Sequence, residues 1–111
     1  MIEDGDYLVL TDSEADSKAR EYILDSVWAF NKSFLDGHSE AIAEMNDASF
    51  KKLQEGCESI NKAILKMIDD VDHFMDDAIR CDGRGHFLSG YDGKENDQKV
   101  GEVYYYIYRQ N

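Results

Sequence analysis

The sequence of 111 residues has no proline, only two cysteines and half as many basic residues as acidic ones. Twelve lysines and arginines face 24 aspartates and glutamates, which leaves a formal net charge of −12. Phosphate backbones and anionic lipids repel such a chain, so direct nucleic-acid binding and membrane adhesion are disfavoured. The lack of proline and the 12% aromatic content exclude a disordered acidic tail and predict a single domain over residues 1–111.

Cys57 and Cys81 are too few for a disulfide scaffold, and we expect free thiols at core or boundary positions in a reducing compartment. No apolar run approaches the roughly 18 residues of a membrane-spanning helix. Residues 1–6 also lack the basic region of a signal peptide. The sequence therefore predicts a cytoplasmic protein.

The order of hydrophobic patterns predicts an α+β fold with an N-terminal strand, a helical block with two long amphipathic helices, and a C-terminal β-hairpin forming a small antiparallel sheet. The first strand is expected over residues 7–11, where β-formers run together. A capping box then starts a long helix that continues over residues 12–36. The second long helix is expected over residues 58–80. Residues 39–56 fit either one helix or two.

The hairpin is predicted from two aromatic segments, residues 86–91 and 102–109, joined by the polar loop 92–99. In the last strand, alternation places one set of tyrosines on a single face: Tyr104, Tyr106 and Tyr108. This ladder is typical of packing or of an oligomer contact, or it stacks on a planar ligand. A monomer and a homodimer through the C-terminal strands or the first helix both stay open.

An acidic run is the first candidate for function, and its members are Asp69, Asp70, Asp72, Asp76 and Asp77. Such a run is typical of a solvated helix face. It is also the pattern of a surface that imitates nucleic-acid phosphates and binds a basic groove on a partner protein. A metal site is not predicted, because Lys94 follows Asp92 where an EF-hand loop needs an oxygen ligand.

A second candidate is a cluster of polar and aromatic residues near the C-terminal strand: Arg84, His86, Ser89, Tyr91, Asp92, Tyr104, Tyr106, Tyr108 and Arg109. Its glycines permit a close approach of the backbone. One interpretation is structural, with the glycines ending a helix and Arg84 or Arg109 pairing with a carboxylate. The other is a binding site for an anionic or nucleotide-like ligand.

No catalytic constellation is apparent, and no cofactor or metal is predicted. Ser89 does not lie in a G-x-S-x-G turn, and no C-x-x-C or H-x-x-x-H pair supports zinc. Cys81 lies near His86 in the sequence, but the motif that would orient a thiol nucleophile is missing. A hydrolase that uses His86 with Cys81 or Ser89 stays an alternative.

Two segments carry a resemblance to a known group of proteins. The opening Tyr-Leu-Val-Leu-Thr-Asp-Ser-Glu-Ala-Asp with Ser26–Asn31, and the ending Asp-Gly-Arg-Gly-His-Phe-Leu-Ser-Gly-Tyr-Asp-Gly with Tyr106–Arg109, resemble small acidic uncharacterised proteins encoded in tailed-bacteriophage or prophage genomes. The similarity spans most of the chain. It implies a phage setting in the cytoplasm of a host cell and carries over no catalytic or ligand residue.

Two functional hypotheses follow from these patterns. The first is a phage-type accessory interaction protein that binds and inhibits a host or defence protein with a basic surface, through acidic helix faces. The alternative is a small-molecule or nucleotide-sequestering module that uses the C-terminal Arg, His and Tyr residues.

Overall fold

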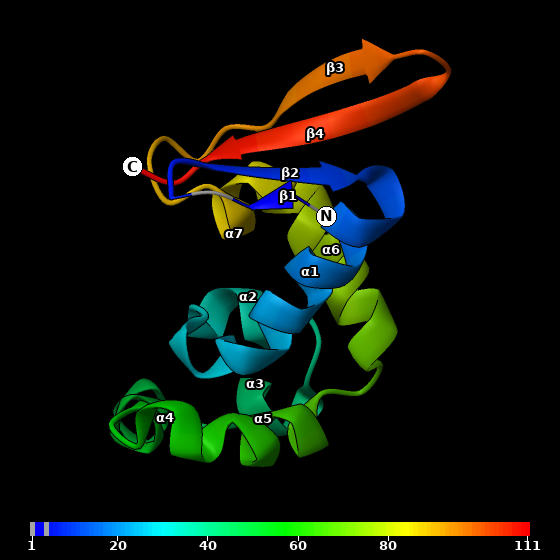
Figure 1. The fold of residues 1–111 in the computed structure, drawn as a ribbon. Coiled ribbons are helices and arrows are strands. Elements are labelled where there is room, and N and C mark those ends of the chain that lie inside the picture. The colour runs from blue at the N-terminus through cyan, green and yellow to red at the C-terminus, as the bar shows by residue number, and fades with distance from the viewer. Residues whose placement is uncertain (1, 4) are drawn as a thin grey trace. The chain divides into compact units, whose positions relative to one another are not determined.

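The computed structural model describes residues 2–3 and 5–111 and has the predicted α+β class (Figure 1). The strands are β1 (Ile2–Glu3), β2 (Tyr7–Thr11), β3 (Asn96–Val100) and β4 (Val103–Arg109). The helices are α1 (Asp12–Asp25), α2 (Lys32–Asp36), α3 (Glu40–Ala43), α4 (Asp47–Gln54), α5 (Asn61–Met67), α6 (Val71–Asp82) and α7 (Arg84–Leu88). Two 3₁₀ turns are η1 (Val27–Ala29) and η2 (Cys57–Ile60).

The elements group into two compact units. Unit 1 comprises Met1–Tyr22 and Asp77–Asn111, and unit 2 comprises Ile23–Asp76. Unit 1 contains the sheet and α7, whereas unit 2 is helical. A single domain over residues 1–111 stays a prediction beside this division. No helix in the described part of the chain combines the length and the apolar character needed to cross a membrane.

The sheet of unit 1 is antiparallel, with the strand order β1-β2-β4-β3. Its centre joins β2 to β4, and Tyr7 lies opposite Arg109 while Thr11 lies opposite Tyr105. The predicted N-terminal strand is thereby confirmed, as is an antiparallel pair of C-terminal strands, whose second strand lies where it was expected. The predicted capping box also forms, because the Thr11 N–H donates to the Glu14 carboxylate at 3.0 Å. This backbone hydrogen bond lowers the pKa of Glu14.

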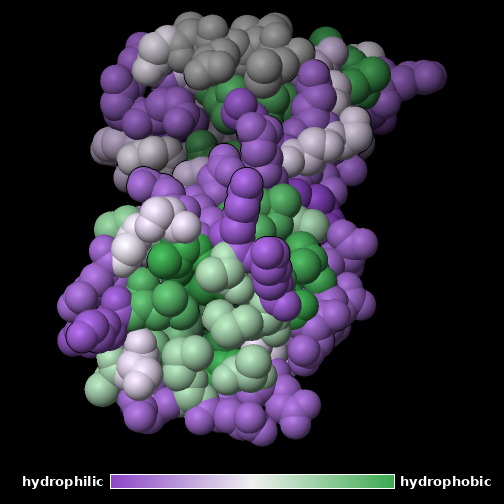
Figure 2. Space-filling model, turned by 90° about the horizontal axis from the view of Figure 1, so that it is seen from below, coloured by the Kyte–Doolittle hydropathy of each residue, from purple (hydrophilic) through white to green (hydrophobic). Residues whose placement is uncertain are grey.

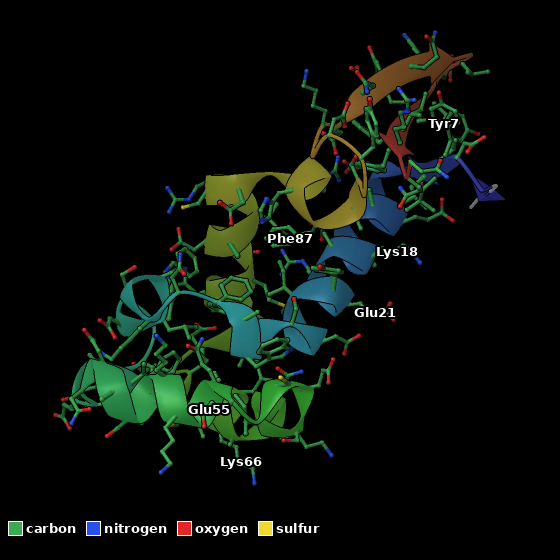
Figure 3. The ribbon with its side chains drawn as sticks, turned by 90° about the vertical axis from the view of Figure 1, so that its left-hand side faces the viewer. Tyr7, Lys18, Glu21, Glu55, Lys66 and Phe87 are labelled. Carbon is green, nitrogen blue, oxygen red and sulfur yellow. The ribbon has the colours of Figure 1, made fainter. Side chains whose placement is uncertain are left out.

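The core of unit 1 lies between one face of the sheet and the helices beside it (Figure 1). Alternation along β2 and β4 directs Leu8, Leu10 and Tyr108 to this face, where all three are buried. Phe87 is buried on α7 (Figure 3), and its ring lies 6.0 Å from that of Tyr22 on α1. Burial of these large apolar groups drives the docking of α7.

The predicted first strand of the hairpin, residues 86–91, is wrong. Residues 84–88 form the short helix α7, and β3 lies further along, mostly in the segment 92–99 that was expected to be a loop. Residues 96–99 are poor β-formers, so their strand depends on the ladder with β4, a non-local contact that overrides local propensity. The connection between the two strands of the hairpin is therefore the tight turn Gly101–Glu102, with Gly101 at φ 65°, and not the loop 92–99.

The first predicted long helix, residues 12–36, is interrupted after Asp25. The break is held by two side chains from distant segments. Asn61 donates to the Asp25 carbonyl at 2.6 Å and accepts from the Trp28 N–H at 2.9 Å. Gln54 donates to the carbonyls of Trp28 and Phe30 at 2.8 and 3.0 Å. These bonds replace the helical partners that the break removes.

The second predicted long helix, residues 58–80, is divided at residues 68–70. Ile68 is extended, with ψ 128°, and the Asp69 N–H donates to the His38 carbonyl at 2.9 Å. The Asp70 carboxylate then accepts from the His73 N–H at 3.1 Å and so caps the start of α6. The apolar periodicity of residues 58–80 predicted one continuous helix across this point. Asp70 instead caps a new helix, which divides the segment into α5 and α6.

The segment 39–56, left open between one helix and two, contains α3 and α4. Each begins with a side-chain cap, from Ser39 to the Ile42 N–H and from Asn46 to the Ser49 N–H. The buried residues of unit 2 include Ile42, Phe50 and Phe74. Figure 2 shows apolar side chains bordered by hydrophilic ones on the face seen from below.

Candidate functional site

The acidic run forms the loop before α6 and one side of that helix. Asp69 and Asp70 lie in the loop, and Asp72 and Asp76 lie on α6; all four are exposed. We call these four residues of unit 2 the acidic surface. The four-residue spacing of Asp72 and Asp76 corresponds to a rise of about 6 Å along the helix axis. Both side chains therefore project in similar directions.

Asp77 is separated from this surface by its contacts. Its side chain is 19% exposed and forms an ion pair with Arg80, which follows it by three residues. The Cys81 thiol lies 3.8 Å from the same carboxylate. Asp77 also belongs to unit 1. We therefore leave Asp77 out of the acidic surface, although the sequence placed it in the same run.

Three carboxylates of the acidic surface have no cationic partner within the described part of the chain. They are Asp69, Asp70 and Asp72, and none of them forms a salt bridge with a described lysine, arginine or histidine. The positive end of the α6 dipole and the cap to His73 stabilise this charge locally. A strongly negative, accessible surface results.

The second candidate cluster is organised around Arg84, which is already paired. The Arg84 Nε donates to Glu95 at 2.8 Å, and its Nη1 donates to the Asp12 carboxylate at 2.9 Å. Its guanidinium carbon lies 4.7 Å from the centre of the Tyr106 ring. Burial acts to lower the pKa of Arg84, but the bonds to Glu95 and Asp12 raise it above the ordinary value. This confirms the predicted pairing with a carboxylate.

The tyrosine ladder runs from the core to solvent. Tyr108 is fully buried, and its hydroxyl donates to Glu95. Burial and this hydrogen bond both raise the pKa of Tyr108 above the ordinary value of about 10. Tyr106 stacks under Arg84, whereas Tyr104 is 48% exposed and lies beside Lys99. The packing interpretation therefore holds for the inner two tyrosines.

The remaining residues of the cluster brace the loop between α7 and β3. The Ser89 hydroxyl lies 2.7 Å from the Arg109 carbonyl and 3.0 Å from the Asp92 carboxylate. That carboxylate accepts from the Lys94 N–H, and this bond lowers the pKa of Asp92. The Arg109 guanidinium carbon lies 4.0 Å above the Tyr91 ring. These contacts hold the loop between α7 and β3 in place, which is a structural role for these residues.

The contacts of the candidate nucleophiles do not assemble a catalytic pair. The Ser89 hydroxyl is engaged with Asp92 and the Arg109 carbonyl, and the Cys81 thiol lies 3.8 Å from the Asp77 carboxylate. The exposed His86 ring packs edge-on against Phe87. Both cysteines are free and exposed, so the expected core or boundary positions are wrong. Among the described residues, no three His, Cys, Asp or Glu side chains gather as metal ligands.

Comparisons with protein-family models, curated proteins and solved structures gave no significant match to this chain. The fold and the contacts of its residues therefore carry the functional argument.

Sequence reasoning missed Glu95 and Asp12 as the partners of Arg84. Both follow from the fold, because α7 brings Arg84 beside residues that are 11 and 72 positions away in the chain. An arginine among glycines near the end of a helix predicts an ion pair with a carboxylate, but the local sequence does not identify the partner.

Proposed function

We propose that this protein is an interaction protein whose acidic surface occupies a basic, nucleic-acid-binding surface of a partner protein. The observation that carries the proposal is a set of three neighbouring exposed carboxylates that have no cationic partner among the residues described: Asp69, Asp70 and Asp72. A surface of uncompensated carboxylates attracts basic partners over a range that depends on salt.

The spacing of the carboxylates supports phosphate imitation. The axial rise of about 6 Å between Asp72 and Asp76 is close to the axial rise of about 6.8 Å between every second phosphate on one strand of B-DNA. The resemblance to phage-encoded proteins would make the partner a host or defence protein in the host cytoplasm, whose activity the binding inhibits.

A triple variant tests the acidic surface: Asp69→Asn, Asp70→Asn and Asp72→Asn. Asparagine still caps a helix, so α6 is expected to stay intact. The matched control carries Glu44→Gln, Glu55→Gln and Glu58→Gln, which remove the same charge from exposed positions elsewhere in unit 2. The readout is affinity capture from host lysate at two salt concentrations, with mass spectrometry.

We expect the wild type and the control to capture a nucleic-acid-handling protein at low salt. The triple variant should bind that protein about tenfold more weakly, which corresponds to about 0.5 kcal/mol for each carboxylate. Equal weakening in the control would show that overall charge, and not the acidic surface, is responsible. Unchanged capture by the triple variant would contradict the proposal.

The alternative function, sequestration of an anionic or nucleotide-like ligand, has less support. Arg84 is engaged by Glu95 and Asp12, which leaves Arg109 and His86 to supply positive charge. Its test is thermal stabilisation across a nucleotide panel well above micromolar concentration.

A further inference from the structure

The strand β3 is an open edge of the sheet. In the order β1-β2-β4-β3 it pairs with β4 on one side, and the described chain places no strand on the other (Figure 1). All five residues of β3, Asn96–Val100, are exposed. An edge of this kind presents a row of backbone donors and acceptors to any strand that can approach it.

The turn defines which backbone groups face the open side. Val100 and Val103 close the two-residue turn, and this closing pair is hydrogen-bonded in such hairpins. Because hydrogen-bonded and non-hydrogen-bonded pairs alternate, the N–H and C=O groups of Asp97 and Lys99 point away from β4. In agreement, the Lys99 carbonyl accepts from the Gln98 side chain at 3.2 Å.

We propose that β3 pairs with β3 of a second copy of this chain, antiparallel about a two-fold axis at Gln98. Asp97 of each copy then lies opposite Lys99 of the other, as a hydrogen-bonded pair. The backbones form four N–H···O bonds, and the side chains form two cross-strand ion pairs on one face. The two four-stranded sheets become one continuous sheet.

The charges of β3 favour the register with Asp97 opposite Lys99, and they favour a second copy of this chain as the partner strand. A shift by one pair places Asp97 opposite Asp97, or Lys99 opposite Lys99, and like charges directly opposite are unfavourable. The chain carries a net charge of −12, but β3 and β4 together hold two acids and two bases, counting the turn. The hairpin is thus a locally neutral place where two copies can approach.

Exposed apolar side chains beside the edge add to this contact. Val100 is 60% exposed and Val103 is 45% exposed, and both lie at the tip of the hairpin. In the proposed register, Val100 of one copy lies opposite Asn96 of the other, which covers part of the valine. The proposal does not depend on the acidic surface, which lies in unit 2.

Two single variants and their mixture test the pairing by sedimentation velocity and light scattering. The wild type should form a dimer whose mass is twice that of the chain. Asp97→Lys places only lysines opposite each other, and Lys99→Asp places only aspartates, so each variant should dimerise at least about tenfold more weakly. Both residues are exposed, and circular dichroism checks that both variants fold.

An equimolar mixture of the two single variants should restore a one-to-one dimer, because each lysine then meets an aspartate. The double variant Asp97→Lys with Lys99→Asp should likewise form a homodimer. A wild type that stays monomeric to about 1 mM overturns the proposal. Single variants that dimerise as the wild type does, or a mixture that stays monomeric, would also overturn it.

Discussion

Glu95 connects two side chains of unit 1, Arg84 and Tyr108, because its carboxylate accepts a hydrogen bond from each. It accepts from the Arg84 guanidinium at 2.8 Å and from the Tyr108 hydroxyl. Both donors are shielded from solvent, with 13% exposure for the Arg84 side chain and none for Tyr108. Shielded donors of this kind require their acceptor, because a donor without a partner loses its hydration without compensation.

At this scale we predict the effect of Tyr108→Phe. Losing one hydrogen bond to Glu95 should lower the free energy of unfolding by about 1 kcal/mol at neutral pH. Tyr104→Phe is the matched control, because Tyr104 is exposed, and its effect should stay within about 0.5 kcal/mol. Urea unfolding measures both. A loss for Tyr104→Phe as large as that for Tyr108→Phe would contradict the assigned role of the hydroxyl.

The same variant carries a pH dependence. Folding raises the pKa of Tyr108 above its value of about 10 in the unfolded chain. The hydroxyl therefore contributes fully to the free energy of unfolding below about pH 10, and this contribution decreases as the pH rises from about 10 towards the pKa of the folded state. Between pH 8 and pH 10.5 the wild type should therefore lose more stability than Tyr108→Phe.

Among the elements, α7 shows most clearly how a glycine permits a close contact. A Cβ atom on Gly85 would lie 2.6 Å from the Gly93 carbonyl oxygen and 2.6 Å from the Lys94 carbonyl carbon. Both are backbone atoms, which cannot move aside without moving the loop. The close backbone approach expected from the glycine-rich segment is confirmed at this position.

Gly85→Ala should therefore lower the free energy of unfolding by about 1–3 kcal/mol, through overpacking of α7 against the loop. Gly37→Ala is the control. Gly37 has φ −72°, and its nearest contact for a Cβ would be an ordinary 3.6 Å, so the change should be neutral or stabilising. Thermal unfolding measures both. Equal Tm values for the two variants would contradict the close approach.

The elements also show what the sequence can and cannot predict. β2, β4 and the Thr11–Glu14 capping box follow from local patterns, because neighbouring residues alone determine them. The break after Asp25 depends on Asn61 and Gln54, which lie far along the chain. β3 likewise depends on pairing with β4. Contacts of this kind leave no period or motif in the segment they reshape.

The candidate sites divide in the same way. Exposure of Asp69, Asp70, Asp72 and Asp76 follows from the opposition of charge to the apolar stripe. The engagement of Arg84 by Asp12 and Glu95 does not, because the sequence does not say which of many carboxylates the fold will bring to it. The exposed charge was therefore predictable, whereas the identity of the carboxylates that pair with Arg84 was not.

For the whole molecule, net charge is the dominant electrostatic quantity. Three of the described ion pairs join residues three or four positions apart and are partly exposed, so each contributes little. The net charge of −12, by contrast, produces repulsion over the whole surface.

Added salt should therefore stabilise the protein. Raising NaCl from about 0.02 M to about 0.5 M shortens the screening length from about 20 Å to about 4 Å and should raise the Tm by a few degrees. The Asp69→Asn, Asp70→Asn, Asp72→Asn variant has less repulsion and should show a smaller rise. Calorimetry measures both. A Tm that falls with salt would show that the ion pairs outweigh the repulsion.

The central pairing of β2 with β4 has a consequence for the order of events on the ribosome. β2 can pair with β4 only after Arg109, the partner of Tyr7, has been synthesised. Unit 2, by contrast, is one contiguous segment, Ile23–Asp76. The nascent chain can thus condense its helical part while β2 is still without its partner. The later-synthesised strand β4 then closes the centre of the sheet, and a chaperone that shields β2 until that moment would protect it from premature association.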